Sequence, residues 1–181
     1  AVSTSGKAGS AIAKAVAINA SSEHTGVFAV AGVTEVQGGQ ISNVVLDATN
    51  YITINNATIA GMTVLVDDAD RGLRDVINLQ TQTTGVVASL GQNRQLVLTA
   101  EDGRNIEIEV FGLGNQTGLN AGLYGAPLIL SSNENILLQL DPDANGKIGH
   151  FPAVTVGAAP PFDIEPGNFL RDTEAEAHVG S

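Results

Sequence analysis

The chain has 181 residues, a formal net charge of −11 at pH 7 and no cysteine; its length fits one compact domain or two small ones. The missing thiols exclude disulfides, thiolate nucleophiles and cysteine zinc sites, and the acidic surface makes nucleic acid and membrane surfaces poor partners. Aromatic residues make up 4% of the chain and tryptophan is absent, so we expect an aliphatic core.

The first predicted element is a helix that begins after Ser10. Its sequence SAIAKAVAINA is rich in alanine, which favours helix, and Ser10 is a suitable N-cap. Ile12, Ala15 and Val16 have the spacing of one helical face and form the predicted buried stripe. The polar run SSEHTG is expected to break this helix, and residues 27–36 (VFAVAGVTEV) read as one strand-like run.

A second helix is predicted over residues 70–80. Leu73, Val76 and Ile77 lie on one of its faces, and the acidic cluster of Asp67, Asp68 and Asp70 can cap its N-terminus. Strand patterns occupy residues 44–46, 51–54, 63–66, 86–90, 95–99, 105–111, 128–130 and 136–140.

The Asp102-Gly103 pair between two of these strands predicts a hairpin turn that joins residues 95–99 to residues 105–111. Together the patterns predict an α+β fold, mainly antiparallel β-sheet with two short helices packed on it. We expect three parts: residues 1–45, which pack with the C-terminal part; residues 46–140, an α+β domain; and residues 141–181, a proline-rich acidic return segment.

An internal repeat links the two helix patterns. Ile18-Asn19 followed by TGVFA matches Ile77-Asn78 followed by TGVVA, at one offset of 59 residues (18 to 77). Each copy reads as helix, polar turn, glycine and strand. We expect the Ile-Asn pair to close the last turns of the helix, and Gly26 or Gly85 to stop it. The alternative is a coincidence between two ordinary helix–strand turns.

No catalytic constellation is visible, and we predict that the chain is not an enzyme. His24, His150 and His178 lie far apart without metal-ligand spacing, and no GxSxG motif surrounds a serine. Arg71 and Arg74 are expected to pair with Asp67, Asp68 or Asp75 rather than to bind a ligand.

One segment resembles a metal site. Asp141, Asp143 and Asn145, followed by glycine, match the opening of a calcium loop, in which oxygen ligands at alternate positions surround a hard cation. The position of the bidentate glutamate holds Pro152, and a plain turn rich in Asp and Asn explains the same residues. Calcium is the one cofactor that the sequence suggests.

Three longer segments resemble bacterial flagellins. Residues 9–27 (GSAIAKAVAINASSEHTGV) are similar to the segment that leads into the outer domain of many flagellins, and residues 52–108 are similar to the flagellin IN motif. Residues 124–138 (YGAPLILSSNENILL) are similar to the strand pair that follows that motif. The heptad-patterned terminal helices with which flagellins polymerise have no counterpart in this sequence.

The resemblance implies a structural protein of the flagellar filament. The chain would then be a secreted, surface-exposed, antigenically variable outer domain of flagellin on the extracellular flagellum. It would serve motility and surface presentation, with other flagellin subunits as partners and with host or phage surfaces as further contacts. Because the IN motif also occurs in filament cap and hook-associated proteins, the alternative is a binding or adhesive module of one of those.

Overall fold

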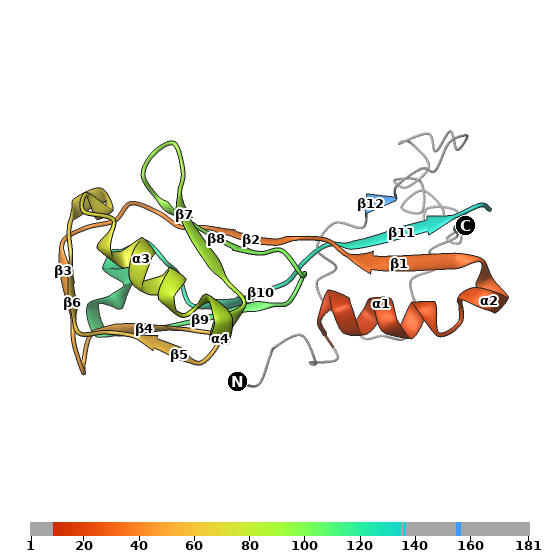
Figure 1. Ribbon diagram of the computed structural model, residues 1–181, viewed down its shortest axis with the longest axis horizontal. Coiled ribbons are helices and arrows are strands. Elements are labelled where there is room, and N and C mark those ends of the chain that lie inside the picture. Colours follow the sequence, from red (N-terminus) through yellow and green to blue (C-terminus); the bar gives the residue numbers. More distant parts are fainter. Residues whose placement is uncertain (1–8, 135, 137–154, 157–181) are drawn as a thin grey trace, which may run out of the picture.

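The computed structural model describes residues 9–134, 136 and 155–156, which form an elongated molecule with two separate hydrophobic cores (Figure 1). The predicted α+β class is confirmed. Short helices accompany four sheets, and every described strand pair is antiparallel except the pairing of β11 with β12.

The smaller unit is built by residues 10–31, 126–134 and 136 together with β12. It contains α1 (Ala11–Asn19), α2 (Ser22–Thr25), β1 (Val27–Ala31), β11 (Leu128–Ser132) and β12 (Thr155–Val156). Its sheet has the order β1-β11-β12, and α1 lies alongside β1 (Figure 1). Segments far apart in the sequence, residues 27–31 and 128–132, are therefore neighbours in space.

The core of the smaller unit corrects one prediction about α1. The side chains buried there are mostly small: Ala11, Ala15, Ala29, Ala126, Leu128 and Leu130. Val16, which the sequence pattern placed on the buried stripe, is 65% exposed. The buried face instead runs through Ala11 and Ala15 to Ile18, one helical turn at a time. An alanine-rich helix has no strong apolar contrast to mark its inner face.

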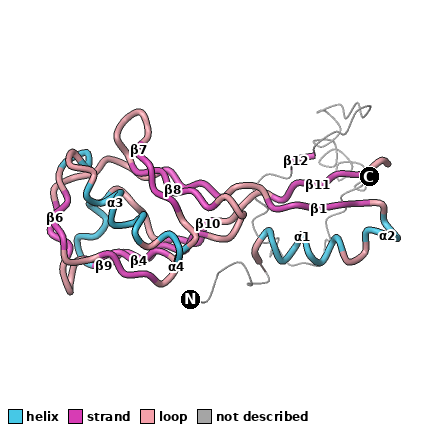
Figure 2. The backbone as a smooth tube through the Cα atoms, in the orientation of Figure 1, coloured by secondary structure: helices cyan, strands magenta, loops and turns pink. Residues whose placement is uncertain are grey.

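The larger unit comprises residues 34–124. Its strands are β2 (Thr34–Gln37), β3 (Val44–Leu46), β4 (Tyr51–Ile54), β5 (Ala57–Ile59), β6 (Met62–Val64), β7 (Val87–Leu90), β8 (Leu96–Ala100), β9 (Ile106–Phe111) and β10 (Gly122–Tyr124). Its helical elements are η2 (Val66–Asp68), α3 (Gly72–Leu79), α4 (Thr81–Thr84) and η3 (Gly112–Thr117). Figure 2 shows how these helices stand beside the strands.

Three sheets enclose the larger core: β10-β9-β4-β5, β2-β8-β7 and the pair β3-β6. Alternate residues of the strands point inward, so that Ile52 and Ile54 of β4 are fully buried. Helix α3 contributes Leu73 and Ile77, both also fully buried, whereas Val76 packs against the core from a half-buried position. The core is aliphatic, as the composition predicts.

The strand-like run at residues 27–36 is divided between the two units, which contradicts the prediction of one run. β1 pairs with β11 in the smaller unit, while β2 pairs with β8 in the larger one. The division falls at Gly32, whose N–H donates to the carbonyl of Pro127 over 2.8 Å. A Cβ on Gly32 would lie 2.8 Å from the Pro127 ring, so the two crossing segments approach too closely for a side chain there.

The predicted hairpin at Asp102-Gly103 is wrong. β8 pairs with β2 and β7, whereas β9 pairs with β4 and β10, so the turn carries the chain from one sheet to another. The turn itself is tight, because Gly103 has a φ of 75° and its N–H donates to the carbonyl of Ala100. An added Cβ at Gly103 would lie 2.5 Å from the carbonyl oxygen of Gly32. The Asp-Gly signal thus predicts the turn but not the partner strand.

The tight hairpin between β4 and β5 was missed. It turns through Asn55 and Asn56, both with positive φ (46° and 68°), which is the backbone of a two-residue hairpin loop. The short strand β10, within the glycine-rich stretch 112–125, was missed as well.

Candidate functional site

The residues of the predicted calcium loop, Asp141, Asp143 and Asn145, lie outside the described residues, as do His150 and His178. Within the part of the chain that the structure describes, no group of three or more His, Cys, Asp or Glu side chains is placed to hold a metal ion. The calcium site therefore stays a prediction.

The structure gives a physical role to the asparagine of each repeat. Asn19 donates from Nδ2 to the carbonyl of Ala29 (2.8 Å) and accepts at Oδ1 from the N–H of the same residue (2.7 Å). Asn78 makes the same pair of bonds with Ala88, at 3.0 and 2.7 Å. We call each such arrangement an asparagine clamp. The clamps bond a strand, rather than closing the last helical turn as the sequence pattern suggested.

Each asparagine clamp closes part of a sheet edge. β1 and β7 are the terminal strands in the described orders β1-β11-β12 and β2-β8-β7. Ala29 and Ala88 are 2% and 3% exposed, so their outward peptide groups are cut off from water and need partners. The side-chain amide presents an N–H donor and a carbonyl acceptor side by side, and these replace the peptide of a missing neighbouring strand. The clamp thereby joins the helix to the strand and protects its edge.

A short helix and a glycine follow each clamp. The polar run at residues 22–25 forms α2 instead of merely breaking the first helix, and α4 is its counterpart in the larger unit. Gly26 and Gly85 end these short helices with φ values of 67° and 69°. The predicted glycine stops are confirmed, although they end α2 and α4 rather than the longer helices. The sequence repeat is thus a repeat of structure, α1-α2-β1 and α3-α4-β7.

Buried Asn55 is a polar residue that the sequence reasoning missed. Its Nδ2 donates to the carbonyls of Thr84 (2.9 Å) and Asn105 (3.2 Å), and its Oδ1 accepts from the N–H of Glu107 (2.8 Å). It therefore joins the β4–β5 turn to α4 and β9. The Asn-Asn pair after the alternating strand pattern ITI was the available signal.

Asp102 and Arg104 form an ion pair in the turn between β8 and β9. Arg104 donates from Nε to both carboxylate oxygens of Asp102, at 3.0 and 2.8 Å. This hydrogen bonding lowers the pKa of Asp102 and raises that of Arg104. Arg104 also covers Gly85, because a Cβ on that glycine would collide with the guanidinium.

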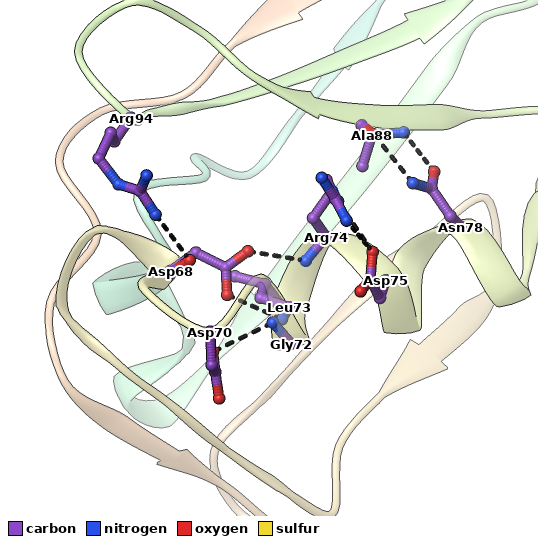
Figure 3. A network of polar contacts seen from close by, with 9 residues as sticks. All are labelled: Asp68, Asp70, Gly72, Leu73, Arg74, Asp75, Asn78, Ala88 and Arg94. Carbon is purple, nitrogen blue, oxygen red and sulfur yellow. Dashed lines mark hydrogen bonds and ion pairs between the residues drawn. The ribbon is translucent and has the colours of Figure 1, made fainter.

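An open cleft of about 610 Å³ lies between α3 and the β7–β8 turn. Three arginines line it together with polar residues, small residues and one leucine. The lining residues are Arg71, Arg74, Asn78, Ala88, Ser89, Leu90, Gly91, Gln92 and Arg94. We call this the arginine cleft, and Figure 3 shows part of its wall.

Buried Asp68 organises one end of the arginine cleft. Its two carboxylate oxygens accept from the N–H groups of Leu73 (2.9 Å) and Arg74 (3.0 Å), so it caps the start of α3, as predicted for the acidic cluster. Asp70 also contributes, since its Oδ1 accepts from the N–H of Gly72 (3.1 Å). The carbonyl of Asp68 in turn accepts from Nη2 of Arg94 over 3.0 Å (Figure 3).

The expected arginine pairing is only partly observed. Arg74 binds Asp75 through Nε (2.8 Å) and Nη2 (2.5 Å). Arg71 makes no side-chain hydrogen bond or ion pair with the residues that the structure describes. Asp68 does not pair with either arginine side chain, because the backbone N–H groups of α3 occupy its carboxylate.

Comparison with known proteins finds a family match for the part of the chain that holds the second copy of the repeat. Residues 52–102 match the family described as the flagellin hook IN motif. The chain therefore contains a flagellin hook IN motif. Over 120 residues, or 63% of its length, it is 37% identical to Flagellin A of Helicobacter pylori (strain ATCC 700392 / 26695), and it spans 22% of the length of that relative.

The flagellin IN motif corresponds to most of the larger unit. It runs from the first buried isoleucine of β4 to the turn that follows β8, and it includes α3, the second asparagine clamp and three arginines of the cleft. The first clamp, at Asn19, lies before the matched residues and repeats the same arrangement in the smaller unit.

Proposed function

We propose that this chain is a surface-exposed outer domain of a flagellin, a structural component of the bacterial flagellar filament. Its match to the flagellin IN motif, together with the likeness to Flagellin A, carries the proposal. The chain would be secreted, would lie on the extracellular flagellum and would serve motility and surface presentation. Its partners would be other flagellin subunits in the filament, and host or phage surfaces would meet it from outside.

The clamped construction suits a module that projects into solvent and bears mechanical load. Both asparagine clamps protect terminal strands, which would otherwise offer free edges for pairing with neighbouring chains. A net charge of −11 keeps such a crowded, repeated surface soluble. Within the described residues no helix is long and apolar enough to cross a membrane. The likeness to flagellins supports a structural role, and we propose no catalysis.

Cysteine labelling tests where this chain lies in the assembled organelle. Because the chain contains no cysteine, a single cysteine introduced into it is the one thiol among these 181 residues. Ala48→Cys, in an exposed turn, should react with a maleimide dye on intact cells and mark the whole length of each filament. Ala88→Cys is the matched control, because Ala88 is 3% exposed and should react only after unfolding.

The pattern of fluorescence separates the two candidate functions. Labelling confined to the filament tip would instead favour the alternative, a binding or adhesive module of a cap protein, and labelling at the filament base a hook-associated protein. Reaction of Ala48→Cys only after the filament is dissociated would mean that subunit contacts cover this turn, which contradicts a surface position.

A further inference from the structure

We propose that the arginine cleft binds a carboxylate-bearing sugar, such as a uronic-acid unit of an acidic polysaccharide. This binding site goes beyond the structural role proposed above and does not depend on it. It rests on the charge, the geometry and the backbone conformation of the residues around the cleft.

The arginine cleft concentrates positive charge on a strongly acidic chain. Lys and Arg together number 8 in the sequence, against 19 Asp and Glu, yet Arg71, Arg74 and Arg94 line this one cleft. Convergent charges of one sign in a concave surface raise the local concentration of counter-ions. The planar guanidinium has the geometry of a bidentate carboxylate partner. The cleft therefore suits a carboxylate.

Two of the arginines have guanidinium N–H groups that no described residue accepts. Arg94 is anchored by Nε and Nη2 on the carbonyls of Asp67 and Asp68, and Nη1 makes no hydrogen bond with the described residues. Arg71, as noted above, has no side-chain partner among them. Arg74 is engaged with Asp75, whose carboxylate offsets its charge, so the available donors are those of Arg71 and Arg94. A carboxylate would thus meet one pre-positioned guanidinium and one that is unengaged.

The backbone beneath these arginines is unusual. Arg71 and Arg94 have φ values of 63° and 57°, and Asp67 and Asp68 also have positive φ (56° and 45°). Such left-handed conformations are costly for residues with long side chains, and they cluster at ligand-binding sites. Glycine at position 71 would make the same turn without strain. The arginine side chain adds a charge that no described contact of the fold uses.

The size and lining of the arginine cleft favour a sugar over other carboxylates. A volume of about 610 Å³ falls within the range of small-molecule sites. Gln92 and Ser89 are among its lining residues. An amide can bind sugar hydroxyls, and the Ser89 hydroxyl, which donates to the carbonyl of Val97 (3.5 Å), can still accept a hydrogen bond.

Calorimetric titration of the purified 181-residue chain with oligogalacturonate, at low and high salt, tests the proposal. We expect saturable binding that weakens with salt, and no binding of a neutral galacto-oligosaccharide. Arg71→Gly should weaken binding by about tenfold or more, through loss of a charge-assisted contact. The same variant should melt at a higher temperature than the parent chain, because the strain at position 71 is relieved. Loss of binding could then not be attributed to unfolding.

Lys14→Gln is the matched control, because it removes one positive charge from α1 in the smaller unit, away from the cleft. It should bind oligogalacturonate within about twofold of the parent chain, since a distant charge is screened by salt. Three outcomes would overturn the proposal: no binding at millimolar oligogalacturonate, equal losses in Arg71→Gly and Lys14→Gln, or tighter binding of polyglutamate than of oligogalacturonate. The last would assign the cleft to an acidic protein segment.

Discussion

At the scale of single residues, the two asparagine clamps are the contacts on which the repeat depends. Asn78→Ala leaves the buried N–H and carbonyl of Ala88 without partners, and it should lower the free energy of unfolding by about 1–3 kcal/mol. Urea unfolding followed by circular dichroism measures the change. Asn93→Ala, at an exposed turn position, is the control and should stay within about 0.5 kcal/mol. Equal effects in the two variants would contradict the role assigned to the clamp.

The repeat also supplies a natural comparison between two glycines. Gly26 and Gly85 share the same left-handed backbone, but a Cβ at Gly26 meets only Ser132 Oγ, at 3.9 Å, whereas a Cβ at Gly85 collides with Arg104. Gly26→Ala should cost about 1–2 kcal/mol from backbone strain. Gly85→Ala should cost more, because Arg104 must leave its place between Asp102 and Thr84.

A double-mutant cycle isolates the contact between Gly85 and Arg104. In an Arg104→Ala background the clash is absent, and the cost of Gly85→Ala should fall to about the 1–2 kcal/mol of the strain alone. Thermal unfolding of the four proteins gives the coupling. Additive effects would show that Arg104 does not constrain this position.

Acid stability depends in part on the turn at Asp47. Backbone N–H groups of Thr49 and Asn50 hydrogen-bond to its carboxylate and lower its pKa from 3.8 to about 2. Because the pKa in the folded state lies below that in the unfolded state, the carboxylate stabilises the fold above about pH 3.8. This contribution should be lost as the pH falls from about 3.8 to about 2.

Asp47→Asn tests this pH dependence. The variant should melt below the parent chain at pH 6, and the difference should shrink as the pH falls through the pKa of the folded carboxyl. A difference in melting temperature that stays constant from pH 6 to about pH 2 would contradict the assigned pKa.

At the scale of elements, the strong apolar periodicity of α3 predicted its buried face correctly. Its predicted inner face contains Leu73 and Ile77, which are fully buried, while Leu79 on the outer side is 79% exposed. Ile77→Ala should cost about 2–5 kcal/mol, as expected for a large-to-small change in a core. Leu79→Ala on the same helix should change stability by less than about 0.5 kcal/mol. Equal losses in chemical denaturation would mean that the helix face is assigned wrongly.

Elements with weak or local signals were predicted less well. For the alanine-rich α1, the N-cap was predicted correctly, since the N–H of Ala13 donates to Ser10 Oγ. Val16, however, was predicted to be on the buried face and is exposed. The Asp102-Gly103 turn was predicted, yet its two strands belong to different sheets. Sequence-local rules report the turn, whereas the choice of a partner strand depends on residues far along the chain. The arginine cleft was likewise invisible, because η2, α3 and the β7–β8 turn meet only in the folded chain.

At the scale of the whole molecule, two cores are joined where three chain segments meet. Gly32, Gly103 and Pro127 pack together at this junction, at distances that leave no space for a further Cβ on either glycine. The repeated αβ arrangement occurs once in each unit, so each half has its own clamp and its own glycine stop. The sequence repeat predicted this duplication, but not that two separate cores would result.

Electron cryo-microscopy of the intact filament would show where this chain lies. We expect density for this chain to form the outermost layer along the filament shaft, and to be elongated with two lobes that match the larger and smaller units (Figure 1). Density for this chain in the inner tube of the filament, or its absence from the shaft, would contradict the proposal of a surface-exposed flagellin domain.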